Sequence, residues 1–82
     1  MEYFVYILFS EKFDKLYIGH TNNIDRRIYE HNLGHEKSTR SGIPWKLVYS
    51  RAFASRSEAY NEEQRIKKRK SKKYLEKLIN QV

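Results

Sequence analysis

A nearly unbroken apolar run close to the N-terminus constrains the fold more than any other feature of the sequence. The run extends from Tyr3 to Phe9, YFVYILF, and is rich in aromatic and β-branched residues. A short run of this composition is typical of a buried β-strand. Residues 10–14 carry turn chemistry, and residues 16–19 predict a second strand. The two strands are therefore expected to form an antiparallel hairpin.

Helical signals follow this hairpin. Thr21, Asn22 and Asn23 are candidate N-caps, and Asp25 would lie in the first turn. The sequence predicts a helix from about residue 24 to 33, with Ile24 and Ile28 facing inward and Gly34 as its C-cap. Residues 35–44 are polar and predict a loop with room for one helical turn. The histidines at 20 and 35 are interpreted as loop residues.

The second half of the chain predicts another strand and more helix. Residues 45–53, WKLVYSRAF, form the third strand, and Ser55 with Glu58 has the form of a capping box. The helix that follows carries Ala59, Glu63 and Ile66 on one face. An apolar stripe at positions 74, 75, 78 and 79 predicts a helical tail. The expected fold is an α/β domain with a three-stranded sheet flanked by helices, in the order β-β-α-β-α plus the tail.

The length of 82 residues fits a single domain over residues 1–82, whose core must be thin. The chain has no cysteine, so disulfides and thiolate zinc sites are excluded. No apolar run reaches the roughly 18 residues of a membrane span. The N-terminus lacks the basic region and cleavage site of a signal peptide. We therefore expect a soluble, cytoplasmic protein.

The positive charge is concentrated in one segment. Seven of the 17 Lys and Arg residues lie within residues 65–73, RIKKRKSKK, so the remaining 10 balance the 10 Asp and Glu residues. Such a block usually meets a polyanion, because neutralised phosphates release counterions. The candidate nucleic-acid contacts are Lys67, Lys68, Arg69 and Lys70. The alternative is a solvated helix face with no partner.

Four side chains recur at regular intervals before this segment. Tyr6 and Tyr17 lie on the two strands of the hairpin, which could bring their rings together. Arg27 and His31 follow four residues apart, on one face of the first helix. Glu63 shares a helical face with apolar residues, so its carboxylate must be paired, hydrogen-bonded or bound to metal.

These residues resemble the motifs of the GIY-YIG nuclease superfamily, and within it the small stand-alone bacterial proteins of the UPF0213 type. Tyr17-Ile18-Gly19 matches the second motif, and Phe4-Val5-Tyr6 occupies the first, where phenylalanine and valine replace glycine and isoleucine. The combined pattern YIG-x7-R-x3-H and SRSEA-x3-E-x2-IKK covers most of the chain and is far more specific than any single element.

The resemblance implies a metal-dependent nuclease acting on DNA or another nucleic acid. Tyr17 would be the general base or would position the attacking water, and Tyr6 would orient Tyr17 or that water. Arg27 would stabilise phosphate charge, and His31 would touch phosphate or support Arg27. Glu63 would bind one Mg²⁺ or Mn²⁺. Because the chain shows no second domain for target choice, a protein partner is expected to supply specificity.

Each residue also has a simpler interpretation. Tyrosines pack in strands, arginines lie on helix surfaces, and Glu62 or Glu63 could pair with Lys67. The rival functions are a non-catalytic or weakly catalytic nucleic-acid-binding module that uses residues 65–73, and a structural RNA-associated protein.

Overall fold

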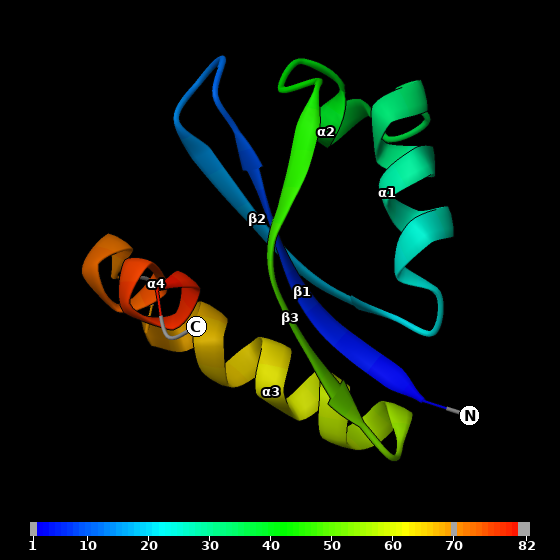
Figure 1. The fold of residues 1–82 in the computed structure, drawn as a ribbon, viewed down its shortest axis with the longest axis vertical. Coiled ribbons are helices and arrows are strands. Elements are labelled where there is room, and N and C mark those ends of the chain that lie inside the picture. Colours follow the sequence, from blue (N-terminus) through cyan, green and yellow to red (C-terminus); the bar gives the residue numbers. More distant parts are fainter. Residues whose placement is uncertain (1, 70, 81–82) are drawn as a thin grey trace.

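A three-stranded antiparallel sheet with helices on both faces forms the domain (Figure 1). The computed structural model describes residues 2–69 and 71–80. This architecture confirms the predicted α/β class, and the helical turn allowed for in the polar loop is the four-residue helix α2. In chain order the elements are β1 (Tyr3–Ser10), β2 (Lys15–Thr21), α1 (Ile24–Leu33), α2 (Lys37–Arg40), β3 (Trp45–Phe53), α3 (Arg56–Arg69) and α4 (Lys72–Ile79).

Strand β1 is the centre of the sheet, which has the order β2-β1-β3. Both neighbours pair with it in antiparallel register. A strand that is paired on both edges and covered on both faces should be apolar throughout, and residues 5–8 are all buried. Since successive side chains point to opposite faces, Val5 and Ile7 face one helical layer while Tyr6 and Leu8 face the other.

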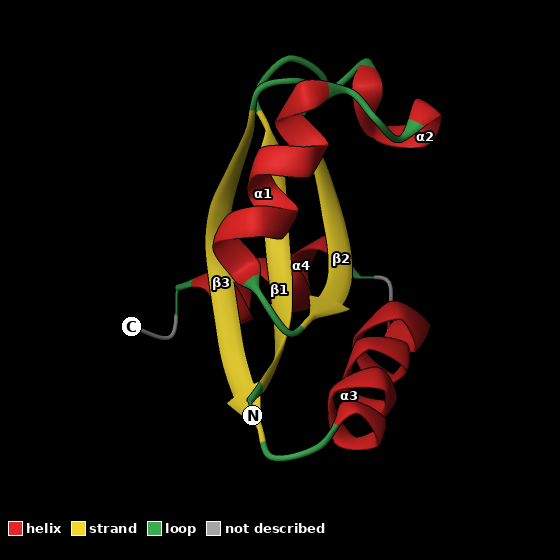
Figure 2. Ribbon diagram, turned by 90° about the vertical axis from the view of Figure 1, so that its right-hand side faces the viewer, coloured by secondary structure: helices red, strands yellow, loops and turns green. Residues whose placement is uncertain are grey.

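The two faces of the sheet have separate cores. Helices α3 and α4 cover one face of the sheet, and α1 covers the other (Figure 2). The first core contains the buried residues Val5, Ile7, Ala59, Ile66, Leu75 and Leu78. The second contains Tyr6, Leu8 and Trp45, with Tyr17, Ile28 and Ile43 packed against them. The tyrosines and Glu63 therefore come from different layers.

The predicted caps set the helix boundaries. The Asn23 side chain accepts a hydrogen bond from the Arg26 backbone N–H at 3.0 Å and begins α1. Gly34 ends this helix with a φ of 79°, a left-handed conformation that glycine adopts without steric cost. The Ser55 hydroxyl accepts from the Glu58 N–H at 3.2 Å, as the capping box predicted.

Strand β2 is longer than predicted, and the loop assignment of His20 is wrong. The strand continues past Gly19 because His20 pairs with Val5 and Thr21 with Phe4. The sequence predicts a strand that ends at Gly19, but the N-terminal half of β1 offers His20 and Thr21 pairing partners. His35 lies in a loop, as expected. Within the part of the chain that is described, no helix is long and apolar enough to cross a membrane.

Candidate active site

Two tyrosine rings meet on the α1 face of the sheet. The register places Tyr6 opposite Gly19 and Tyr17 opposite Leu8, so both side chains point to the same face, and their ring centroids lie 6.3 Å apart. Gly19 makes this arrangement possible. A Cβ atom at position 19 would lie 2.6 Å from the Tyr6 hydroxyl oxygen, which is closer than atoms can pack. Any larger residue would displace the Tyr6 hydroxyl.

His31 joins these tyrosines from helix α1. It is fully buried, and its ring centroid lies 4.8 Å from that of Tyr17. Its Nε2 is 3.2 Å from the Tyr6 hydroxyl, and its Nδ1 is 3.2 Å from the Thr39 hydroxyl. The Thr39 hydroxyl donates its proton to the Glu36 carbonyl at 3.4 Å. It must therefore accept from His31 Nδ1–H, which leaves Nε2 to accept from the Tyr6 O–H.

This chain of hydrogen bonds requires a neutral imidazole. Burial lowers the pKa of His31, and the positive charge of Arg27 lowers it further. Burial also raises the pKa of Tyr6 to about 12, although Arg27 acts in the opposite direction. Tyr6 therefore keeps its proton at neutral pH. It can therefore donate a hydrogen bond to Nε2 of His31.

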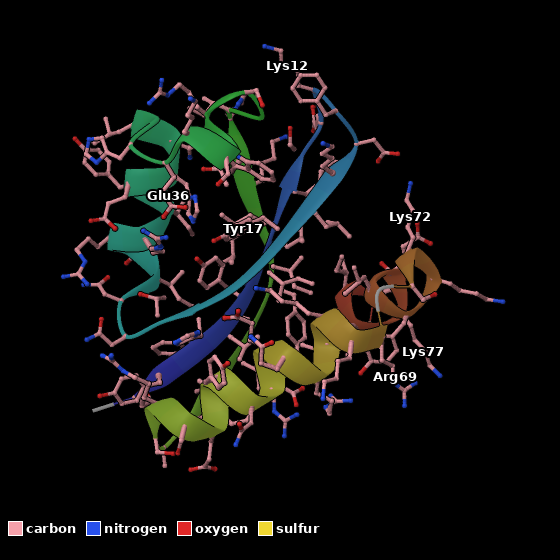
Figure 3. All side chains as sticks on the ribbon, turned by 180° about the vertical axis from the view of Figure 1, so that it is seen from behind. Lys12, Tyr17, Glu36, Arg69, Lys72 and Lys77 are labelled. Atoms are coloured by element: carbon pink, nitrogen blue, oxygen red, sulfur yellow. The ribbon has the colours of Figure 1, made fainter. Side chains whose placement is uncertain are left out.

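Arg27 lies at the rim of this cluster. Its side chain is 28% exposed and forms ion pairs with Glu36 and, at 3.4 Å, with Glu30. Burial lowers the pKa of Arg27, but the Tyr6 hydroxyl and Glu30 outweigh that effect, so the guanidinium remains charged. Figure 3 shows Tyr17 and Glu36 on the side of the sheet that carries α1. Arg27 is thus held beside Tyr6 by its ion pairs with Glu30 and Glu36.

Glu63 approaches from helix α3, on the other layer. It is 7% exposed and is the only buried carboxylate among the described residues. Its two oxygens accept from His20 Nδ1 at 2.6 Å and from Lys67 Nζ at 2.7 Å. After burial and Tyr17, the Glu63 charge also contributes to the high pKa of Tyr6. A geometric link to Tyr17 runs through Lys67, which is paired with Glu63 and lines one hollow together with Tyr17.

The donor set limits what kind of metal ion could bind. Residues 2–69 and 71–80 contain no group of three or more His, Asp or Glu side chains placed to hold one. A hard cation such as Mg²⁺ is often held by one or two carboxylates, with water and substrate phosphate as the other ligands. Glu63 fits that mode, since Lys67 is 45% exposed and free to move away. It does not fit a cage made of protein ligands alone.

The basic residues that the sequence predicts to contact nucleic acid differ in their interactions with the rest of the protein. Lys67 is paired with Glu63, and the Arg69 guanidinium lies 4.8 Å from the ring centroid of Tyr74. Lys68 is exposed and makes no ion pair with any described residue. Lys70 lies outside the described residues. Lys67 and Tyr17 line one shallow hollow together with Leu16, Ile18 and Leu75.

Three residues of the site were not anticipated. Thr39 and Glu36 come from the polar segment between α1 and β3, where no periodicity or motif distinguishes one residue from the next. His20 had a detectable signal. It follows Ile18 by two positions, so in a continuing strand it faces α3 together with Ile18.

The protein is a small α/β domain. One face of its sheet carries a cluster of Tyr6, Tyr17 and His31 with Arg27 at the edge of the cluster, and the other face carries the carboxylate of Glu63. The model of the GIY-YIG catalytic domain matches residues 2–76, so the chain belongs to the GIY-YIG family. This is a family of nucleases, which act on nucleic acids and generally use divalent metal ions.

Relatives of the UPF0213 group cover most of the chain. A UPF0213 protein of Oceanobacillus iheyensis is 40% identical over 67 residues, which are 80% of this chain and 77% of that protein. One from Clostridium perfringens is 47% identical over 66 residues, or 79% of this chain and 70% of that protein. The solution NMR structure of a UPF0213 protein from Bacillus halodurans superimposes with a TM-score of 0.58 at 38% identity, covering 96% of this chain and 83% of that one.

Proposed function

We propose that the protein is a metal-dependent nuclease that hydrolyses phosphodiester bonds in DNA or another nucleic acid. The observation that carries this proposal is the convergence of Tyr6, Tyr17 and His31 beside Arg27, with the buried carboxylate of Glu63 on the opposite layer of the sheet. Hydrolysis requires a positioned water, a stabilised phosphate charge and a neutralised leaving oxygen. These side chains supply a group for each requirement.

Tyr17 is the residue that handles the attacking water. It is only half-buried, and its hydroxyl makes no hydrogen bond to any described residue, so it is available to a water molecule. Tyr6 and His31 are buried and have their hydrogen-bonding groups engaged with each other and with Thr39. They position Tyr17 through ring packing and do not touch the substrate.

Arg27 binds the scissile phosphate. Its guanidinium can exchange Glu30 and Glu36 for two phosphate oxygens, because its planar donors match a bidentate acceptor. Negative charge on these oxygens grows in the transition state, so the interaction strengthens as the reaction proceeds.

Glu63 would hold the metal ion, Mg²⁺ or Mn²⁺. When bound, such an ion neutralises charge on the phosphate and on the leaving oxygen. His20 donates a hydrogen bond to one oxygen of Glu63 and keeps the carboxylate oriented. Lys67 would dissociate from the other oxygen when the metal ion binds there. The released Lys67, which lines one hollow with Tyr17, binds the backbone of the nucleic acid there, and Lys68 and Arg69 on the same helix add further phosphate contacts.

The test is a panel of labelled single-stranded, duplex and branched DNA and RNA, incubated with Mg²⁺, Mn²⁺ or EDTA. We expect cleavage with a divalent ion and none with EDTA. The Glu63→Gln protein is the control for a contaminating nuclease. Binding of these substrates without cleavage under every condition would instead identify a nucleic-acid-binding module.

A further inference from the structure

The ammonium group of Lys67 lies on the buried carboxylate of Glu63. Its Nζ is 2.7 Å from Oε2, and the lysine follows Glu63 by one helical turn on α3. His20 Nδ1 contacts the other oxygen at 2.6 Å, and the Gln64 amide makes a long contact of 3.5 Å with Oε2. Within residues 2–69 and 71–80, Lys67 is therefore the only ion-pair partner of Oε2.

Lys67 also borders the place where the proposed substrate lies. Its side chain is 45% exposed, and it lines one hollow together with Tyr17. The neighbouring Lys68 carries the same charge but is exposed and makes no ion pair with any described residue. The two lysines therefore differ in one respect. Lys67 must give up a carboxylate before it can contact a phosphate, whereas Lys68 has none to give up.

Two cations compete for the Oε2 oxygen of Glu63. Magnesium binds carboxylate oxygens at about 2.0 to 2.1 Å, and the Lys67 ammonium already lies 2.7 Å from Oε2. Positive charges at such short range repel each other, and a buried carboxylate is poorly screened by water. If Lys67 left without a replacement, the buried charge would lose a partner at a cost in free energy. The ammonium and a metal ion are therefore alternatives at this oxygen.

We propose that Lys67 is an exchangeable cation on Glu63 and that its release couples metal binding to nucleic-acid binding. Without metal, a phosphate can bind Lys67 only by breaking its pair with Glu63. With metal on Glu63, Lys67 is already free to bind a phosphate in the hollow beside Tyr17. Each ligand therefore strengthens the binding of the other by the same factor. The inference rests on the proposed function, which assigns the metal to Glu63.

The first measurement is the affinity for Mn²⁺ without nucleic acid, followed by electron paramagnetic resonance. Lys67→Met keeps the apolar stem and removes the ammonium, so we expect it to bind Mn²⁺ about 3- to 10-fold more tightly than the wild type. Lys68→Met removes the same charge from the next residue and should leave the Mn²⁺ affinity unchanged. Lys67→Arg keeps a cation at position 67 and should bind Mn²⁺ as weakly as the wild type.

The second measurement is the coupling factor, the ratio of DNA affinities with and without Mn²⁺. Short labelled single-stranded and duplex DNA are titrated by fluorescence anisotropy, and every protein carries Arg27→Ala to slow cleavage. In Lys67→Met the coupling factor should fall by the same factor by which Mn²⁺ binding tightened, because both changes belong to one thermodynamic cycle. Lys68→Met should weaken DNA binding through a lost phosphate contact but keep the coupling factor of the wild type.

Failure of this proposal can be distinguished from failure of the proposed function. Equal Mn²⁺ affinity in the wild type and Lys67→Met, or an equal coupling factor in Lys67→Met and Lys68→Met, overturns the exchange even if the protein cleaves DNA. Tighter Mn²⁺ binding with reduced coupling in a protein that cleaves nothing supports the exchange and removes the nuclease. Urea unfolding checks that each variant folds, and Lys67→Gln, which has a neutral amide donor, replaces Lys67→Met if that variant does not.

Discussion

The Tyr6 hydroxyl lies 3.2 Å from Nε2 of His31, which joins the central strand to the first helix inside the protein. On the other side of the ring, the Thr39 hydroxyl lies 3.2 Å from His31 Nδ1. The Tyr6 hydroxyl, His31 Nδ1 and the Thr39 hydroxyl therefore each donate one hydrogen bond along this series. Tyr6 and His31 are both buried, whereas Tyr17, whose ring packs against both of them, is half-buried. In the proposed function they position Tyr17, and Tyr17 and Arg27 meet the substrate.

Tyr17→Phe should separate chemistry from stability. The change removes one oxygen and almost no volume, and the lost hydroxyl has no partner among the described residues. The urea midpoint of unfolding should therefore barely move. Cleavage should fall by roughly 10²-fold or more, as expected when a positioned proton acceptor is removed. The control is Tyr29→Phe on the exposed face of α1. Full activity in Tyr17→Phe would assign the ring to packing.

Arg27→Ala should lower the cleavage rate by roughly 10²- to 10³-fold, because charge stabilisation in the transition state is lost. Arg27→Lys should recover little, since an ammonium cannot form two parallel hydrogen bonds. Arg26→Ala removes the same charge from the neighbouring exposed position and should reduce cleavage only slightly. Equal losses in the Arg26 and Arg27 variants would indicate a general charge effect.

Glu63→Gln should abolish cleavage that depends on Mg²⁺ or Mn²⁺ while the protein remains folded. Binding of Mn²⁺, followed by electron paramagnetic resonance in the presence of nucleic acid, should weaken as well. Glu62→Gln is the matched control, because Glu62 forms ion pairs with Arg65 and Arg51. If Glu62→Gln lost metal binding and Glu63→Gln kept it, the assignment of the ligand would be reversed.

Most of this fold was predictable because local signals agreed with tertiary packing. Asn23, Gly34 and Ser55 mark helix ends through hydrogen bonds and a left-handed conformation that few other residues provide. The pairing of Tyr6 and Tyr17 followed from the hairpin alone. Thr39 could not be predicted as the partner of His31, because it belongs to a polar segment without periodicity.

The electrostatic partners were less predictable than the elements that carry them. Nothing in the sequence indicates that Glu36 pairs with Arg27, since the contact joins two elements through a loop whose path only the structure shows. His20 was assigned to a loop because Gly19 was interpreted as the end of the strand. The pleat, which alternates side chains between faces, explains why it instead contacts Glu63 on α3.

Lys68 should contribute a phosphate contact that is independent of sequence. The residue is exposed and makes no ion pair with any described residue, so it needs no rearrangement to bind. Lys68→Ala should weaken binding of all sequences alike and reduce the slope of log K against log salt by about 0.9. Lys46→Ala on β3 removes an equal charge that pairs with Glu11 and should leave the slope unchanged. An identical slope in both variants would remove Lys68 from the interface.

Acidification should destabilise the protein through His31. Burial, with the charge of Arg27, lowers the pKa of His31 in the folded state, so the unfolded chain binds this proton more readily. The free energy of unfolding should therefore be largest above the unfolded pKa of about 6.5 and should fall as the pH drops below it.

Urea unfolding of the wild type and of His31→Gln from about pH 5 to pH 7.5 measures this effect, because glutamine keeps a hydrogen-bonding side chain but cannot titrate. For each protein, the slope is the change in the free energy of unfolding with pH. Because the two proteins differ by one titrating proton, their slopes can differ by at most about 1.4 kcal/mol per pH unit. Parallel curves would mean that His31 binds its proton equally well in both states. A protonated His31 cannot accept the Tyr6 O–H, so the pH range that destabilises the fold should also disturb the Tyr6 ring against which Tyr17 packs.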